Sequence, residues 1–199
     1  MIFCANPLKQ YTAYKTEIDS AINSVLNNGD YILGKEVKKF ENEFSEFIGT
    51  KYGIGVGSGT EALHIALKAC DIGTGDEVIT TPNSFIASTA AIVHLGAIPI
   101  FVDVKKDQNI DPDIIKKAIT SKTKAIMPVH LTGRICEMDP IIALAEKYSL
   151  AVVEDAAQAI GSKYKDHLSG SFGHVGCFST HPLKNLNACG DGGFITTND

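Results

Sequence analysis

Leu150-Ala-Val-Val-Glu-Asp-Ala-Ala-Gln158 joins an uninterrupted apolar run to two carboxylates. A short apolar run of this kind is typical of a strand that is buried on both faces of a parallel sheet. Glu154 and Asp155 would end that strand, and ligands of open α/β sheets bind beyond the carboxyl ends of the strands. This stretch therefore directs attention to the residues that follow each strand.

Outward from this run, predicted strands alternate with predicted helices. The strands are 52–56, 78–81, 98–102, 125–129, 150–153 and 175–178, and a further strand covers 194–197. The helices are 60–70, 84–95, one that begins at Asp111-Pro112, and 140–148. Asp111 is a good N-cap, and proline is favoured at the first helical position. The alternation predicts a mostly parallel sheet with helices on both faces.

Two amphipathic helices are expected before the first strand. The apolar stripe of the first ends at Gly29, and its members are Ile18, Ile22, Val25 and Leu26. The stripe of the second ends at Gly49, and its members are Val37, Phe40, Phe44, Phe47 and Ile48. Glycine is favoured just after a helix because it tolerates a left-handed backbone.

Composition is that of an ordinary globular domain, with 44% hydrophobic and 21% charged residues among 199. The net charge of −5 and the absence of a long basic run make nucleic acid a poor partner. Five cysteines at 4, 70, 136, 177 and 189 form no CxxC pair, which favours free thiols in the cytoplasm. Neither a signal peptide nor a membrane span is predicted, because polar residues interrupt the apolar stretch 90–104.

Gly57-Ser-Gly-Thr60 lies between a predicted strand and a predicted helix. Glycines let the backbone approach a ligand, and helix N-termini attract phosphate. The alternative interpretation is a tight turn capped by Thr60. A dinucleotide-binding turn fits poorly, because its third glycine falls on Thr60 and the acids that follow precede their strand. A P-loop is excluded, because the sequence has no GKS or GKT.

Four polar residues lie at or beyond the ends of two later predicted strands. Asp155 is either a helix cap or a ligand for a positive group, and Gln158 follows three residues later. Ser179 ends the strand 175–178, and Lys184 lies in the turn beyond it. An isolated lysine is usually just solvated. A phosphate cradle, a carboxylate and a lysine at strand ends are nevertheless the groups that pyridoxal phosphate requires.

Ordered motifs along nearly the whole chain resemble the DegT/DnrJ/EryC1/StrS family of sugar aminotransferases. These motifs are Tyr31-Ile-Leu-Gly34, Gly57-Ser-Gly-Thr-Glu-Ala-Leu63, Pro128-Val-His-Leu131, Asp155-Ala-Ala-Gln158, Ser171-Phe-Gly173, Phe178-Ser-Thr-His-Pro-Leu-Lys-Asn185 and Gly190-Asp-Gly-Gly193. The resemblance implies the three-layer α/β/α sandwich of an aspartate-aminotransferase-like (type I) large domain, with pyridoxal 5'-phosphate as cofactor.

The resemblance also implies a role for each matching residue. Lys184 would bond covalently to the cofactor aldehyde, and Asp155 would pair with the ring nitrogen. Gln158 would contact the phenolic oxygen of the ring. The phosphate would be held by Gly59, Thr60 and Ser179. Phe85 would stack on the ring. The alternative interpretation, which the sequence supports equally, is that Phe85 is a helix residue whose side chain packs in the core.

Two histidines and two departures from the family pattern complete the comparison of motifs. His130 and His181 are expected to be structural. Thr180 stands where the family often has an aromatic residue, and Asp191 where it usually has glutamate. Both departures bear on substrate detail. Lys184 itself argues against the family branch that carries histidine there and performs dehydration.

The implied activity is transfer of an amino group from an amino acid, glutamate above all, to a nucleotide-linked keto-deoxysugar. The alternatives are another type I enzyme (a lyase, a desulfurase or a sugar dehydratase) or a non-catalytic regulator that binds a nucleotide sugar. Residues 1–199 are expected to be the cofactor-binding domain, with helices over 12–48 and an α/β core over 50–199. Family members are typically about twice as long, so we expect the small C-terminal domain to be missing and the fragment alone to be inactive. A homodimer is expected.

Overall fold

The computed structural model describes residues 5–199, and Cys4 therefore lies outside the described residues. Its centre is a seven-stranded sheet in the order β1-β9-β8-β5-β4-β2-β3. The strands are β1 Tyr52–Val56, β2 Glu77–Thr80, β3 Ile98–Phe101, β4 Thr123–Ile126, β5 Ala151–Asp155, β8 Val175–Ser179 and β9 Gly193–Thr197. β9 pairs antiparallel with both β1 and β8, whereas the pairs among the remaining strands are parallel. The sheet is mostly parallel, as predicted.

Helices cover both faces of this sheet. They are α3 Lys35–Ile48, α4 Gly59–Ala69, α5 Ile86–His94, α6 Pro112–Ala118 and α7 Met138–Tyr148. On one face, α4 and α5 pack over a core that includes Val78, Ala125 and Val153. On the other face, α6 and α7 cover the β2 to β5 side, and α3 covers β8 and β9. The predicted three-layer α/β/α sandwich is confirmed.

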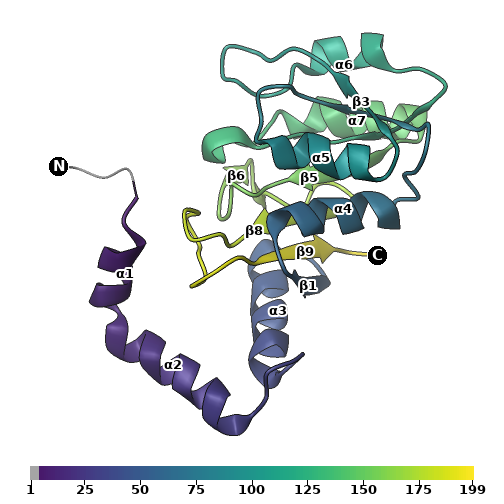
Figure 1. Ribbon diagram of the computed structural model, residues 1–199. Coiled ribbons are helices and arrows are strands. Elements are labelled where there is room, and N and C mark those ends of the chain that lie inside the picture. Colours follow the sequence, from purple (N-terminus) through teal and green to yellow (C-terminus); the bar gives the residue numbers. More distant parts are fainter. Residues whose placement is uncertain (1–4) are drawn as a thin grey trace.

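An N-terminal arm precedes the sandwich. Figure 1 shows α1 Pro7–Ala13 and α2 Lys15–Asn28 extending away from the sheet, and neither helix contains a buried residue. The predicted apolar stripe on α2 is therefore exposed, with Ile22 at 45% and Leu26 at 54% of full exposure. The stripe of α3 behaves differently, because the Phe44 ring packs against both Phe178 and Phe194. The sequence did not indicate α1.

Several helix ends follow the sequence rules. Gly29 and Gly49 adopt left-handed conformations after α2 and α3, and Asp111 caps α6 by accepting a hydrogen bond from the Asp113 N–H. The interpretation of residues 57–60 as a turn capped by Thr60 was wrong about the cap, because Ser58 caps α4. Short elements that the sequence did not indicate are the hairpin of β6 Lys163–Tyr164 with β7 His167–Leu168 and the 3₁₀ turn η1 Leu131–Gly133.

Within residues 5–199, the four cysteines are free thiols. Over the same range, the structure holds no group of three or more His, Cys, Asp or Glu side chains that could bind a metal ion. No helix in this described part of the chain is both long and apolar enough to cross a membrane.

Candidate active site

The ends of three strands meet at one edge of the sheet. β5 is parallel to β8, and β1 points the same way as β8 because β9 is antiparallel to both. The chain leaves β1 towards Gly59, ends β5 at Asp155 and ends β8 at Ser179. Side chains alternate across a strand, so Asp155 shares the α4 and α5 face of the sheet with Val153. Ser179 shares that face with Cys177 in the same way, so Asp155 and Ser179 are on one edge and one face of the sheet.

Gly59 and Ser179 lie against each other at the start of α4. A Cβ atom on Gly59 would lie 2.7 Å from the Cβ and 3.3 Å from the Oγ of Ser179. The Ser58 side chain and carbonyl accept hydrogen bonds from Glu61 and Ala62, respectively. No acceptor is found among the described residues for the N–H groups of Gly59 and Thr60. Two free amides and a hydroxyl at a helix N-terminus form a cradle for phosphate.

Gly193 on β9 lies directly against the backbone of this cradle. A Cβ atom on Gly193 would lie 2.5 Å from the Ser58 carbonyl carbon and 2.7 Å from the Gly59 nitrogen. A side chain at 193 would therefore displace the backbone that forms the cradle. This contact explains one glycine of the predicted Gly190-Asp-Gly-Gly193 motif.

Asp155 is a buried carboxylate with 6% of full exposure. Its Oδ2 accepts a hydrogen bond from Ser88 Oγ at 2.7 Å, and its Oδ1 accepts one from the Ala157 N–H at 3.2 Å. Burial raises the pKa of the Asp155 carboxyl above its usual range, while these hydrogen bonds and the charge of Lys184 act in the opposite direction. A buried carboxylate at the edge of the sheet is a favourable partner for a cation.

Lys184 is half-buried in the loop after β8. The loop is built on His181, whose N–H donates to Ser179 Oγ at 3.3 Å and whose ring Nδ1 accepts from the Leu183 N–H at 3.1 Å. The His181 carbonyl also accepts from the Lys184 N–H at 2.8 Å. These contacts agree with a structural role for His181, because they fix the path between Ser179 and Lys184.

Gln158 and Phe85 border the same edge. The Gln158 Oε1 atom accepts a hydrogen bond from the Thr132 N–H at 2.9 Å, so its amide nitrogen is the group left to donate to a ligand. Phe85 is the N-cap residue of α5 and is 67% exposed. The alternative interpretation of Phe85 as a residue packed in the core is therefore wrong. An exposed aromatic ring here is available to cover a planar ligand.

Two buried polar contacts were missed by sequence reasoning. Ser88 contacts Asp155 from a position 67 residues away along the chain, and its only sequence signal is a spacing of one helical turn from Ser84. On the opposite face of β5, fully buried Glu154 accepts hydrogen bonds from His130 Nε2 and from three backbone N–H groups. The His130 Nδ1 atom accepts from the Cys136 N–H, so the hydrogen bonds suit a ring whose proton is on Nε2. His130 is thus a buried support of the strand that carries Asp155.

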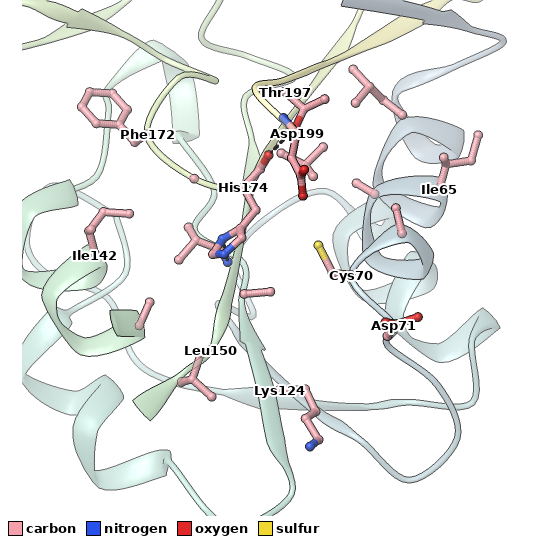
Figure 2. Close-up of a pocket in the computed structure, with 18 of the residues that line it drawn as sticks. Ile65, Cys70, Asp71, Lys124, Ile142, Leu150, Phe172, His174, Thr197 and Asp199 are labelled. Carbon is pink, nitrogen blue, oxygen red and sulfur yellow. Dashed lines mark hydrogen bonds between the residues drawn. The ribbon is translucent and has the colours of Figure 1, made fainter. Parts of the chain in front are cut away.

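A large cavity lies elsewhere. It has a volume of about 1010 Å³ and lies where β5 and β8 begin and β9 ends, as Leu150, His174 and Thr197 in its lining show (Figure 2). This is the sheet edge opposite to Asp155 and Ser179. Two of its polar groups are used internally, since the His174 ring accepts from the Val152 N–H and the His174 carbonyl accepts from Thr197 Oγ1. Size alone therefore does not identify the candidate active site.

Comparisons with known proteins concern the chain as a whole. The model of the DegT/DnrJ/EryC1/StrS aminotransferase family matches residues 12–199. A "Pleiotropic regulatory protein" from Geobacillus stearothermophilus is 47% identical over 192 residues, which cover 96% of this chain and 52% of that protein. The dTDP-3-amino-3,6-dideoxy-alpha-D-galactopyranose transaminase from Aneurinibacillus thermoaerophilus is 51% identical over 187 residues, or 94% and 52% of the two chains.

A similar solved structure is NtdA from Bacillus subtilis with bound cofactor PMP. It superposes with a TM-score of 0.89 at 37% identity, and the match covers 94% of this chain and 42% of that one. The chain thus spans about half the length of the relatives that it matches.

Proposed function

The chain belongs to the DegT/DnrJ/EryC1/StrS aminotransferase family, and from that premise we propose that it is the cofactor-binding domain of a pyridoxal-phosphate sugar aminotransferase. The proposed reaction moves an amino group from an amino acid, glutamate above all, to the keto carbon of a nucleotide-linked deoxysugar. One observation carries the proposal: the cradle at Gly59 and Ser179, buried Asp155 and the Lys184 loop lie at one edge of the sheet. These are the phosphate, ring-nitrogen and aldehyde partners that the cofactor needs.

The residues of the cradle fit the phosphate group. The N–H groups of Gly59 and Thr60 and the hydroxyl of Ser179 would donate to it, and the helix dipole of α4 favours negative charge there. The absence of a side chain on Gly59 leaves room for both the phosphate and Ser179, which a Cβ atom would approach to 2.7 Å.

The residues around the ring fit a planar cation. When bound, pyridoxal phosphate supplies an aldehyde that bonds to amines and a ring that accepts electrons while its nitrogen is protonated. The Asp155 carboxylate would accept a hydrogen bond from that nitrogen and favour the protonated form. The free amide nitrogen of Gln158 would donate to the ring oxygen, and Phe85 would cover one face.

Lys184 has two tasks in this proposal. Its amine would hold the cofactor by a covalent bond to the aldehyde. Once an amino donor had freed it, the same amine would act as the base that moves the proton at the donor's α-carbon. Thr60, Gln158 and Phe85 only bind, so Lys184 is the catalytic residue of the set.

We further propose a cytoplasmic homodimer whose product serves the synthesis of a polysaccharide or a glycosylated metabolite. The exposed apolar surface of the arm supports an interface, since Ile22, Leu26 and the connector residues Ile32 and Leu33 are all exposed. Two-fold symmetry is the commonest arrangement for such assemblies. The sugar-transaminase name of one relative supports the substrate class.

The sequence left two alternatives to this proposal open: another enzyme of the same fold, and a regulator without catalysis. A lyase or desulfurase of the same fold would use the same cofactor contacts, and a regulator without catalysis is suggested by the name of one relative. The presence of both Lys184 and Asp155 favours a catalyst, because a silent regulator needs neither an amine for the aldehyde nor a partner for the ring nitrogen.

The experiment uses the full-length gene product incubated with pyridoxal phosphate. We expect visible absorption that borohydride removes, with the cofactor then fixed to Lys184 in a peptide map. Lys184→Ala should lose the adduct, whereas the matched change Lys165→Ala should keep it. Glutamate should convert the bound cofactor to its amine form, and a panel of nucleotide-linked keto sugars should convert it back. An adduct on another lysine, or no response to glutamate and keto sugars, would contradict the proposal.

A further inference from the structure

Ser88 is a buried hydroxyl directly behind the Asp155 carboxylate. It lies on α5, is fully buried, and donates to Asp155 Oδ2 at 2.7 Å. Ser84 Oγ lies 2.9 Å from Ser88 Oγ. A serine has one hydroxyl proton, and that of Ser88 goes to the carboxylate, so Ser84 is the donor between the two serines. The other acceptor within reach of the Ser84 hydroxyl is the Phe85 carbonyl at 3.2 Å, which is farther away than Ser88 Oγ. The result is a chain of hydrogen bonds from Ser84 through Ser88 to Asp155.

We infer that Ser88 is a positioning residue, which keeps the Asp155 carboxylate ionised and holds it in place so that the cofactor's ring nitrogen retains its proton. The inference rests on the proposed function, and it adds a residue that acts through Asp155 without touching the cofactor. Ser84 strengthens the effect, because a hydroxyl that accepts a hydrogen bond becomes a better donor.

Charge balance at Asp155 explains why such a donor is needed. Burial favours the neutral acid and raises the pKa of the Asp155 carboxyl, and the hydrogen bond from Ser88 is the largest influence in the opposite direction. The other opposing groups are the Ala157 N–H and the charge of Lys184, whereas His130, whose Nδ1 accepts from the Cys136 N–H, fits the neutral ring. Cys177, paired with Asp155 on the neighbouring strand β8, is a thiol whose own pKa burial raises, so it stays neutral and adds no negative charge beside the carboxylate.

The alternative location of the shared proton shows what Ser88 prevents. If the carboxylate becomes the stronger base, the proton moves from the ring nitrogen to Asp155 Oδ1 or Oδ2. The ring is then neutral and is a weaker electron acceptor. A hydrogen bond donated to the carboxylate lowers its basicity and therefore keeps the proton on the ring.

The test measures the protonation of both partners in the full-length protein. Aspartate labelled with ¹³C at the carboxyl carbon gives the titration midpoint of Asp155 in the apoprotein, with the signal assigned by its loss in Asp155→Asn. We expect Ser88→Ala to raise that midpoint by about one to two pH units, since a hydrogen bond to a charged group is worth that much. Pyridoxal phosphate labelled with ¹⁵N in its ring should show a shift towards the unprotonated value in the same variant.

The controls separate positioning from simple stability. Ser88→Thr keeps the hydroxyl and should restore both signals. Ser169→Ala removes another fully buried hydroxyl, which donates to the Ala159 carbonyl, and should leave both signals unchanged. An unchanged Asp155 midpoint or an unchanged ring-nitrogen signal in folded Ser88→Ala would overturn the inference. A wild-type protein that fails to attach the cofactor to Lys184 would instead overturn the proposed function, and the inference with it.

Discussion

Replacing Gly59 by alanine tests the phosphate cradle with a single methyl group. The new Cβ atom would lie 2.7 Å from the Ser179 Cβ, whereas ordinary contact begins at 3.4 Å, so α4 and β8 must separate by about 0.7 Å. Overpacking of this kind costs about 1–3 kcal/mol. Alanine is preferred to glycine in a helix by about 0.5–1 kcal/mol. We therefore expect a net loss of unfolding free energy of about 1 kcal/mol.

Cofactor affinity should change more than stability. The separation moves the Ser179 hydroxyl away from the N–H groups of Gly59 and Thr60, so the three donors no longer fit one phosphate group. A hydrogen bond to a charged group is worth about 1.5–3 kcal/mol. The dissociation constant for pyridoxal phosphate should rise roughly ten- to hundredfold.

The assay is a titration of the full-length apoprotein followed by visible absorbance, with thermal unfolding measured alongside. Gly73→Ala is the matched control, because a Cβ atom there meets nothing within 4 Å. If Gly59→Ala bound the cofactor as tightly as Gly73→Ala does, the cradle would not hold the phosphate.

Three further predictions concern neighbouring side chains. Asp155→Asn should lower turnover at least a hundredfold, about 2.7 kcal/mol of barrier. The fold raises the pKa of the Asp155 carboxyl, so the folded apoprotein binds this proton more tightly than the unfolded chain does. The free energy of unfolding of the wild type, measured in urea, should therefore fall relative to that of Asp155→Asn as the pH rises from the unfolded pKa through the raised pKa. Glu154→Gln should lower the free energy of unfolding of the apoprotein by about 3 kcal/mol, because an amide cannot accept the four hydrogen bonds that the carboxylate accepts. A free energy of unfolding within about 1 kcal/mol of the wild-type value would contradict this prediction. Gln158→Glu keeps the acceptor for Thr132 but loses the free donor, so cofactor affinity should fall about tenfold without loss of thermal stability, and equal affinity would contradict the assigned amide orientation.

The sequence predicted those features that depend on neighbours along the chain. Apolar runs located the strands of the sheet, and Gly29, Gly49 and Asp111 located helix ends, because each acts on its own few residues. The prediction of Thr60 as the cap in this turn was wrong, since serine and threonine are both good caps and only the geometry shows that Ser58 caps α4.

Features that depend on distant partners were not predictable in the same way. The contact of Ser88 with Asp155 joins positions 67 residues apart. Glu154 meets its three backbone donors in the turn that follows β7, and its fourth donor is His130, which follows β4. The cofactor roles assigned to the site residues remain predictions that rest on the family resemblance and on the placement of these residues, which are Gly59, Thr60, Phe85, Asp155, Gln158, Ser179 and Lys184.

The position of β9 in the sheet sets the order in which the domain can be completed during protein synthesis. β1 pairs in the sheet with β9 alone, although nearly 140 residues separate the two strands in the chain. Until the ribosome has released β9, the turn that follows β1 cannot be held beside β8. Contacts at such sequence separation form slowly, because a long loop must close first. A nascent chain that already has Asp155 and Lys184 is therefore expected to capture the cofactor only after Gly193 has emerged and β9 has inserted between its two neighbours.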